Sequence, residues 1–292
     1  MNRSYRIEAE IGSGGSGAVY LAWHTRLRKH VVIKVVKDNS SGALEVLRNE
    51  VEALKHIKCI YVPQVLDFCS ENDHSFTVME YIRGESFDKL LKLGQKFTEK
   101  QILKWYGQLA SALDSIHKND VFHRDIKPSN IMLTKSGDVC LIDFNSAYVS
   151  GNNTGIISRS MGYASPEQYE FFKLCRSRKV SSAKGTDLIE TIFLGKGMRN
   201  TVSGEGGSHD LGVYEIDWKL SDIYSLGATM YHFLTGKRPP VRADEVEQIP
   251  KLVGYSEALL RIIEHSMRAN PSQRFASAKE LGFAIKNVIC FN

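Results

Sequence analysis

The spacing of apolar residues predicts a chain that begins with strands and continues mainly as helices. Between residue 5 and about residue 36, short apolar runs alternate with polar residues and glycines, a pattern typical of an antiparallel β-meander. Residues 76–82 predict another strand, and Gly84 just after it suits a hinge between two parts of the chain. The pattern therefore indicates a small β-rich lobe followed by a larger helical lobe.

Helical periodicity also selects one carboxylate of the first lobe. Residues 42–57 place their apolar side chains on one helical stripe. At about 100° per residue, Glu50 falls on this buried side, whereas Glu52 projects almost opposite. We therefore expect Glu50 to face the interior and Glu52 to face solvent. A capping box at residues 98–101 then opens a long amphipathic helix that leads to His123.

Three further helices are predicted in the second half of the chain. Ser221 and Asp222 form an N-cap signal for a helix that Gly236 ends. Residues 256–267 and 277–288 have the periodicity of two more helices.

The segment of about residues 171–217 differs in composition from its surroundings. It is rich in Ser, Gly, Lys and Arg, and only residues 188–194 form a short apolar run. We interpret it as an insertion within one domain. A disordered loop is the simpler interpretation, and an element that recognises substrates is the alternative.

Composition narrows the class of protein without identifying a partner. The 292 residues are 42% hydrophobic and 24% charged, with a net charge of +5, as in ordinary globular proteins. The five cysteines are scattered without C-x-x-C pairs, which favours a reducing compartment over disulfides or zinc. No secretory signal, membrane-spanning run of about 18 to 20 apolar residues, or nucleic-acid signature is found. We expect a cytoplasmic protein, or the cytoplasmic part of a longer one.

The most informative stretch is His123-Arg124-Asp125-Ile126-Lys127-Pro128-Ser129-Asn130, with Asp143 shortly after it. Two apolar strands joined by a Ser-Gly-Asp turn would bring Asp143 back beside Asn130. Transfer of a phosphoryl group needs a base, a cation and oxygen ligands for magnesium, and this set offers all three. A charged surface loop is the alternative interpretation.

Two features of the predicted β-rich lobe suit the same chemistry. Residues 11–19 have a G-x-G-x-x-G-x-V pattern, and β-type residues follow it, which favours a strand-loop-strand flap over a dinucleotide-binding turn. A plain glycine-rich hairpin remains possible. Lys34 lies in an apolar strand, where an unpaired ammonium is unfavourable, and Glu50 is its predicted partner. A solvent-facing lysine at the edge of the sheet is the alternative.

Taken in order, these motifs resemble the eukaryotic-like (Hanks-type) protein serine/threonine kinases, and most of all their bacterial members. The resemblance runs from the glycine-rich loop to Arg274. It implies an α+β, two-lobed fold in a single kinase domain, with a β-rich N-lobe of about residues 1–82 and a mainly helical C-lobe of about residues 85–292. ATP would bind in the cleft between the lobes.

The resemblance also assigns residues to the ATP site. Lys34, paired with Glu50, would hold the α- and β-phosphates. Met79 would be the gatekeeper, and the backbones of Glu80 and Ile82 would bind the edge of adenine. The remaining positions form the flap over the phosphates or enclose the ring: Ile11, Gly12, Gly14, Gly17, Val19, Val32 and Met132.

For catalysis, the resemblance implies that Asp125 accepts or orients the proton of the substrate hydroxyl, with Lys127 near the γ-phosphate. Asn130 and Asp143 would ligate Mg²⁺, or alternatively Mn²⁺. His123 and Phe144 would stack as structural residues without a catalytic role.

Three other residues have structural roles by the same resemblance. Glu167 and Arg274 would form a buried ion pair. Asp222 would support the backbone of the catalytic loop, although a simple helix cap is the alternative.

Asn145 departs from the family pattern, because a glycine usually follows Asp-Phe. Asn tolerates left-handed backbone conformations best among the other residues, so we expect activity to survive. Arg124 precedes the catalytic Asp and in the family often meets a phosphate on the activation segment. Thr154 or Ser158 is the predicted phosphosite, since Ser160 occupies the place of a substrate-facing threonine.

The sequence therefore predicts an enzyme that transfers the γ-phosphate of Mg-ATP to Ser or Thr of proteins, including itself. One alternative is a pseudokinase that only binds, for which Asn145 is the single argument. The other is a small-molecule kinase, which the presence of Lys127, Glu167 and Arg274 disfavours.

Overall fold

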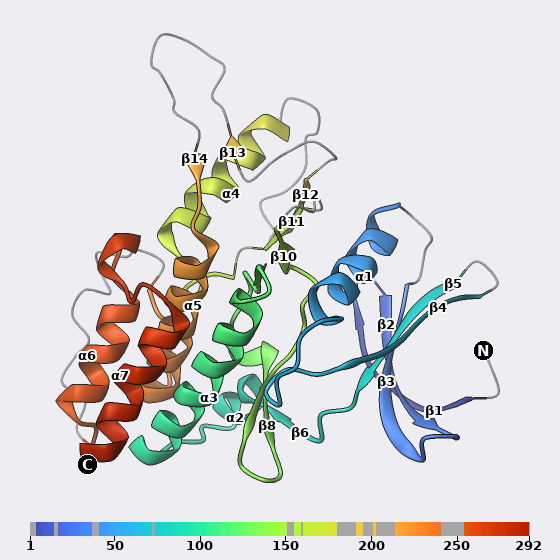
Figure 1. Ribbon diagram of the computed structural model, residues 1–292, viewed down its shortest axis with the longest axis horizontal. Coiled ribbons are helices and arrows are strands. Elements are labelled where there is room, and N and C mark those ends of the chain that lie inside the picture. The colour runs from blue at the N-terminus through green and yellow to red at the C-terminus, as the bar shows by residue number, and fades with distance from the viewer. Residues whose placement is uncertain are drawn as a thin grey trace.

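The computed structural model describes residues 4–14, 17–36, 41–71, 74–150, 155–158, 160–179, 191–194, 201–202, 214–240 and 254–291. Strands with a single helix gather at one end of the molecule, and helices fill the other end (Figure 1). The α+β, two-lobed fold predicted from the sequence is confirmed.

The N-lobe is an antiparallel five-stranded sheet in the order β1-β2-β3-β5-β4. Its strands are β1 (Tyr5–Gly14), β2 (Gly17–His24), β3 (Lys29–Val35), β4 (Val65–Glu71) and β5 (His74–Glu80). The register pairs Val19 with Lys34 and Val32 with Met79, so these four residues lie side by side in the sheet. Helix α1 (Ser41–Leu54) contacts β4 and β5. The predicted β-meander and helix are both present.

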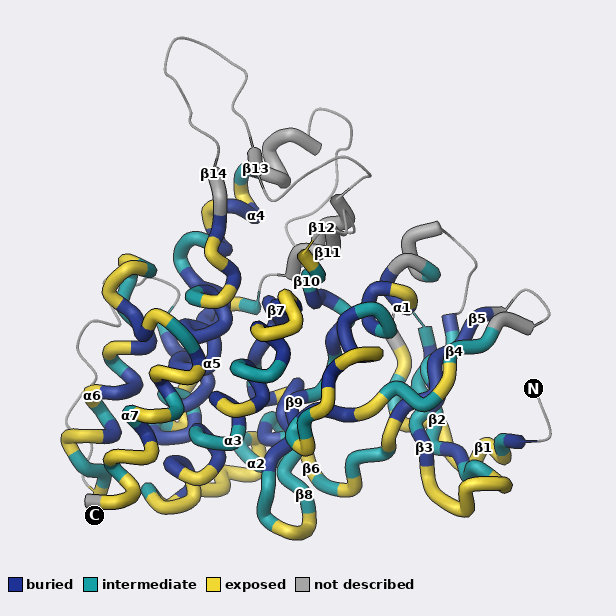
Figure 2. Tube along the Cα trace, in the orientation of Figure 1, coloured by how far each residue is buried: buried dark blue, intermediate teal, exposed yellow. Residues whose placement is uncertain are grey.

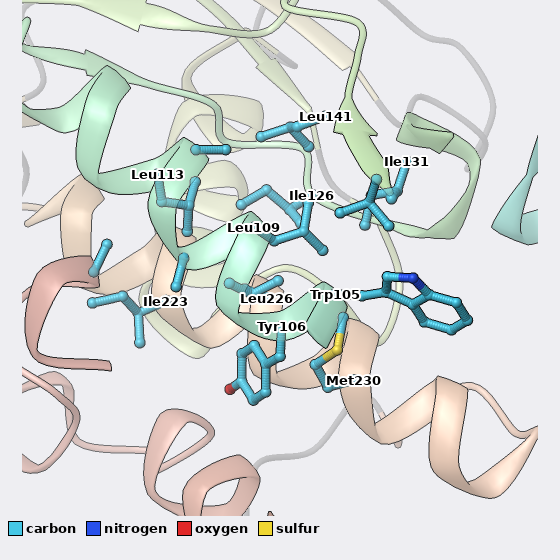
Figure 3. Packing of buried hydrophobic residues seen from close by; sticks show 14 of the residues in the cluster. Trp105, Tyr106, Leu109, Leu113, Ile126, Ile131, Leu141, Ile223, Leu226 and Met230 are labelled. Atoms are coloured by element: carbon cyan, nitrogen blue, oxygen red, sulfur yellow. The ribbon is translucent and has the colours of Figure 1, made fainter. Parts of the chain in front are cut away.

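The helical lobe is built around two buried helices. It contains α2 (Phe87–Lys92), α3 (Glu99–His117), α4 (Pro166–Lys179), α5 (Trp218–Thr235), α6 (Glu257–Ser266), the short helix η3 (Pro271–Gln273) and α7 (Ala278–Phe291). Apolar side chains of α3 and α5 meet in the main core (Figure 3). Helix α5 is buried along most of its length (Figure 2). Because α3 and α5 are both enclosed in the core, their positions are fixed by packing, and the predicted catalytic loop lies against them.

Short strands and one helical turn connect the lobes and carry the predicted catalytic residues. They are β6 (Gly84–Ser86), β7 (Val121–Phe122), η1 (Pro128–Asn130), β8 (Ile131–Thr134), β9 (Val139–Leu141) and β10 (Tyr148–Val149). The hairpin of β8 and β9 forms as predicted, and β6 extends its sheet. A Cβ at Gly84 would overlap the carbonyl oxygen of Leu133, so the close approach of β6 to β8 requires glycine here.

Several helix boundaries differ from the prediction by a few residues: α1 ends at Leu54, before residue 57, and α7 continues to Phe291, beyond residue 288. The capping box of Thr98 and Gln101 is present, and Gly236 ends α5 with φ +67°. However, α5 begins at Trp218, because the side chain of Asp217 caps it by accepting from the backbone N–H of Lys219. The predicted start at Ser221 and Asp222 is therefore wrong.

The described part of residues 171–217 begins inside a helix. Phe171 and Phe172 belong to α4 and are fully buried against Ile216 and Trp218. The other described pieces are strands: β11 (Gly155–Ser158) pairs with β12 (Thr191–Leu194), and β13 (Thr201–Val202) pairs with β14 (Tyr214–Glu215). Residues 188–190 of the predicted apolar run, and Thr154, lie outside the described residues.

Candidate active site

A buried ion pair links the sheet of the N-lobe to α1. Lys34 on β3 has its Nζ 2.5 Å from Oε1 of Glu50, whose side chain is fully buried. The same oxygen accepts a hydrogen bond from the backbone N–H of Phe144 at 3.2 Å. Glu50 therefore faces inward as the helical pattern predicted, whereas Glu52 pairs with the exposed Lys55 at the surface. One carboxylate thus fixes both the lysine and the segment that carries Asp143.

Asp143 approaches the same lysine from the other lobe. Its Oδ1 lies 3.6 Å from Nζ of Lys34. Burial works against the Lys34 ammonium, but the charges of Glu50 and Asp143 outweigh it and raise the pKa of Lys34. Burial likewise works against the Asp143 carboxylate, but nearby positive charge, chiefly Lys34, holds the pKa of Asp143 below its usual value. Lys34 and Asp143 are therefore both charged at neutral pH.

The predicted catalytic loop brings the carboxylate of Asp125, the ammonium of Lys127 and the amide of Asn130 together. Nζ of Lys127 lies 2.8 Å from Oδ2 of Asp125. The amide nitrogen of Asn130 donates to the backbone oxygen of Asp125 at 2.8 Å and to its carboxylate at 3.2 Å. The hydroxyl of Ser160 donates to the other carboxylate oxygen of Asp125 at 2.6 Å and accepts from Lys127 at 3.1 Å. A hydroxyl therefore meets Asp125 and Lys127 at the same time.

A cleft of about 720 Å³ lies between the sheet and the segments that carry Asn130 and Asp143, and Asp125 and Lys127 are not among the residues that line it. Most predicted ATP-site residues line it, and so do Asn130 and Asp143: Ile11, Gly17, Val19, Val32, Lys34, Met79, Glu80, Ile82 and Met132. Gly12 and Gly14 lie on β1 beside the lining residues, paired with Val19 and Gly17. The prediction omitted other lining residues, including Ala18, Pro63, Glu85 and Ile142, because none of them belongs to a motif that the resemblance assigns to ATP. The lining is apolar at one end and carries charge and amides at the other, as a nucleotide site requires.

The donor set fits a divalent metal bound together with phosphates. Oδ1 of Asp143 is buried without a hydrogen-bond partner among the described residues. The backbone N–H of Ile142 donates to the backbone oxygen of Asn130 at 2.8 Å. This hydrogen bond holds Asp143, the next residue, close to Asn130. No cluster of three His, Cys, Asp or Glu side chains occurs within the described ranges. One carboxylate and one amide suffice only where phosphate oxygens and water complete the shell, which is how Mg²⁺ usually binds.

Asp222 of α5 holds the backbone of the catalytic loop. Its two carboxylate oxygens accept from the backbone N–H groups of His123 at 2.9 Å and Arg124 at 2.8 Å. Nε2 of His117, at the end of α3, lies 3.0 Å from the same carboxylate. The predicted supporting role is thus present, and the helix-cap alternative is not. Arg124 has φ +62°, a conformation that needs such support.

Three supporting residues were not predicted from the sequence. His117 contacts Asp222, the amide of Gln168 donates to the backbone oxygen of Arg124 at 2.8 Å, and the amide of Asn49 donates to the backbone oxygen of Ala147 at 2.5 Å. Each joins segments at least 44 positions apart, and Asn49 and Ala147 are 98 apart. No local sequence pattern marks such contacts. For Asn49, the only signal in the sequence is its place next to Glu50, at the edge of the face of the helix predicted to be buried.

Arg124 is held in the interior. It is 2% exposed, and its Nε donates to the backbone oxygen of Ser146 at 2.8 Å. Its guanidinium lies 4.9 Å from the ring of Trp218 and 5.6 Å from that of Tyr148, within range of cation–π attraction. The predicted contact with a phosphate on Thr154 or Ser158 remains a prediction, since both side chains lie outside the described residues.

The remaining family-like contacts are also in place. The rings of His123 and Phe144 meet edge to face at 4.6 Å. Glu167 and Arg274 form a two-fold ion pair, with N–O distances of 2.6 and 2.9 Å. Asn145 does not have a positive φ, which is instead found at Asp143 (+66°). Asn145 therefore does not need the tolerance of left-handed conformations noted above, and Asn in place of glycine causes no backbone strain in this conformation.

Comparison with known proteins identifies the class that this fold and site define. Residues 5–181 match the protein kinase domain. A probable serine/threonine-protein kinase of Clostridium acetobutylicum is 28% identical over 314 residues, which cover 99% of this chain and 40% of that protein. PknA of Corynebacterium glutamicum is 29% identical over 305 residues, covering 97% and 56%. PknD of Mycobacterium tuberculosis is 27% identical over 307 residues, covering 98% and 40%.

The chain belongs to the protein kinase family, and its named relatives are bacterial serine/threonine-protein kinases, as the sequence predicted. It spans about half the length of these curated relatives. Use of ATP and a divalent metal is general to the family. Among the described residues, no helix has the length and apolar character needed to span a bilayer.

Proposed function

We propose that this chain is an active protein serine/threonine kinase, which transfers the γ-phosphate of Mg-ATP to Ser or Thr hydroxyls of proteins and of itself. One observation carries the proposal. The ion pair of Lys34 and Glu50 meets Asp143 at the cleft, while Asp125, Lys127 and Asn130 are joined by short hydrogen bonds on the adjoining loop. Every charged group that phosphoryl transfer needs is thus positioned before a substrate binds.

The residues divide the reaction between them. Asp125 accepts or orients the proton of the attacking hydroxyl, as the Ser160 hydroxyl that already donates to its carboxylate illustrates. The hydroxyl oxygen forms a bond to the γ-phosphorus while the bond from that phosphorus to the β–γ bridging oxygen breaks, and ADP leaves. Lys127 and Lys34 hold positive charge near the γ-phosphate and the α/β-phosphates, respectively. Asn130 and Asp143 would hold a divalent ion, which would neutralise charge on the phosphates.

Mg²⁺ or, alternatively, Mn²⁺ is proposed as the metal, because the amide of Asn130 and the carboxylate of Asp143 offer oxygen donors, which suit both ions. A cytoplasmic location is also part of the proposal. Cys59, Cys140 and Cys290 are free thiols, which suits a reducing compartment.

The test is transfer of radiolabelled phosphate to peptides and to the chain itself. Asp125→Asn keeps the shape of the loop and removes the base, so we expect a fall in kcat of about 10²- to 10⁴-fold. Asp114→Asn is the matched control, because Asp114 pairs with Lys118 on the surface of α3. Equal and negligible incorporation by the native chain and Asp125→Asn would support the pseudokinase instead. Phosphorylation of small alcohols but never of protein would support a small-molecule kinase.

A further inference from the structure

The loop that follows Ser160 fixes the surface next to the proposed acceptor site. The hydroxyl of Ser160 contacts both Asp125 and Lys127. Its backbone oxygen accepts from the N–H groups of Tyr163 at 3.0 Å and Ala164 at 2.9 Å, which closes a tight turn. Residues 160–163 therefore lie immediately beside the place where a substrate hydroxyl would meet Asp125.

A cationic side chain from the end of α5 reaches this turn. The guanidinium of Arg238 lies over the ring of Tyr163, 5.7 Å from its centroid. The hydroxyl of Tyr163 is 2.7 Å from Nδ1 of His232 on α5. Arg238 is exposed, and it has no ion-pair partner within the described ranges. The ring of Tyr163 therefore holds the guanidinium of Arg238 in place, and no carboxylate of the described residues neutralises its charge.

Backbone packing fixes the arginine relative to the turn. Gly162 has φ +82°, and a Cβ there would lie 2.5 Å from the backbone oxygen of Pro239 and 3.0 Å from Cγ of Arg238. Only glycine permits so close an approach together with that conformation. The segment of Arg238 and Pro239 therefore lies directly against the turn.

The two side chains beside Arg238, His232 and Tyr163, carry no charge that would neutralise it. Burial, reinforced by Arg238, lowers the pKa of His232, so the imidazole is neutral at pH 7. Burial raises the pKa of Tyr163 to about 12, so the phenol is neutral as well. Asp88 on α2 is the acidic group that acts on both, but it pairs with Lys92 at 2.7 Å.

A second acidic side chain near α2, on the cleft side, is paired in the same way. Glu85, which lines the cleft, lies 2.7 Å from Lys89. Both acidic groups are thus offset by lysines one helical turn later. A basic side chain of a substrate would be repelled by Arg238. An acidic one would find a guanidinium that no carboxylate of the described residues pairs.

We propose that Arg238 binds an acidic side chain next to the phosphoacceptor, so that this chain prefers Ser or Thr flanked by an anionic residue. Arg238 is then a specificity-determining residue, and Gly162 and Tyr163 are the residues that position it. The inference rests on the proposed kinase function and adds the class of substrate to it. Carboxylates of Asp or Glu and a phosphate on a neighbouring residue share the chemistry that Arg238 recognises.

The test is a positional peptide scan with the native chain and Mg-ATP. Each position flanking the acceptor is varied among Asp, Asn, Lys and phosphoserine, and kcat/KM is measured for each peptide. We expect Asp to exceed Asn by about two- to fivefold at a flanking position, the ratio of a solvent-exposed ion pair. The ratio should fall in 1 M salt, because screening weakens such pairs. The phosphoserine peptides show whether a prior phosphate serves better than a carboxylate.

Variants at Arg238 assign the preference to this residue. Arg238→Ala should bring the Asp-to-Asn ratio to about one, Arg238→Glu should favour Lys peptides, and Arg238→Lys should retain the preference for Asp. A gain of preference for Lys requires a folded enzyme, so misfolding cannot imitate it. Arg261→Ala is the matched control, because Arg261 is an exposed arginine of α6 that pairs with Glu257.

The outcomes separate this inference from the proposed function. Peptide phosphorylation without a preference for acidic positions, or with one that Arg238→Ala leaves intact, would overturn the inference and leave the kinase function standing. Failure of the native chain to phosphorylate any peptide or itself would refute the proposed function, and the inference with it.

Discussion

The ion pair of Arg274 and Glu167 offers the sharpest test of what holds the helical lobe together. Arg274 is 4% exposed, and its two terminal nitrogens donate to both carboxylate oxygens of Glu167. It also donates to three backbone oxygens: those of Arg268, Leu220 and Ala269. The guanidinium thereby ties α4, α5 and the segment after α6 into one unit.

Replacing Arg274 with Met retains much of the side-chain volume and removes all of these donors. The Glu167 carboxylate, which is 13% exposed, then loses its charged partner in the interior. Removal of one member of a buried pair costs about 3 to 5 kcal/mol, and we expect Arg274→Met to lower the free energy of unfolding by that amount. Glu167→Gln should cost less, about 1 to 2 kcal/mol, because an amide oxygen still accepts from the guanidinium.

Urea denaturation of the folded chain measures both values. Arg268→Met is the matched control, since Arg268 pairs with Glu264 on the surface of α6 at 2.9 Å, with exposed fractions of 41% and 32%. An exposed pair of this spacing contributes about 0.3 to 0.5 kcal/mol. A loss below about 1 kcal/mol for Arg274→Met, or equal losses for Arg274→Met and Arg268→Met, would refute the argument.

Three further predictions concern the site and the turns around it. Glu50→Gln removes the negative charge that faces Lys34. A hydrogen bond between charged groups contributes about 1.5 to 3 kcal/mol, so we expect kcat/KM for ATP to fall about 10- to 100-fold in steady-state assays. Gly162→Ala should lower the free energy of unfolding by more than Gly94→Ala, because both have positive φ but only Gly162 faces a backbone oxygen at 2.5 Å; similar losses in thermal unfolding would contradict this. Hydrogen bonding, chiefly from Lys104, lowers the pKa of Asp138 from 3.8 to about 2. The folded-state value is the lower one, so this contribution to stability is present above pH 3.8 and is lost as the pH falls towards 2, and Asp138→Asn should flatten that part of an acid-unfolding curve.

The conformation of the Asp-Phe-Asn segment bears on regulation. Asn145, which departs from the family pattern, does not have a positive φ. The segment is held by Glu50 through the backbone of Phe144 and by Asn49 through Ala147. These contacts come from α1, so the position of that helix and the position of Asp143 are coupled. A shift of α1 would release Lys34 and Asp143 together.

The sequence by itself determined the class of fold and supplied the assignment of reactive groups that we propose. Several residues proposed to carry the chemistry lie in one short stretch, where covalent spacing alone brings them close, as with Asp125, Lys127 and Asn130. Helical periodicity distinguished Glu50 from Glu52 because burial on one face of a helix is a property of the local pattern. The pairing of Glu167 with Arg274 was available only through resemblance to the family.

Tertiary structure alone decided which elements meet. Asp222 is a plausible helix cap in the sequence, but α5 starts earlier and Asp222 instead accepts from a loop 98 and 99 positions away. Neither the contact of His117 with that carboxylate nor the approach of Arg238 to Tyr163 leaves a signal in the chain. Periodicity tells which face of an element is buried, but the partner that covers it is selected by packing of the whole core.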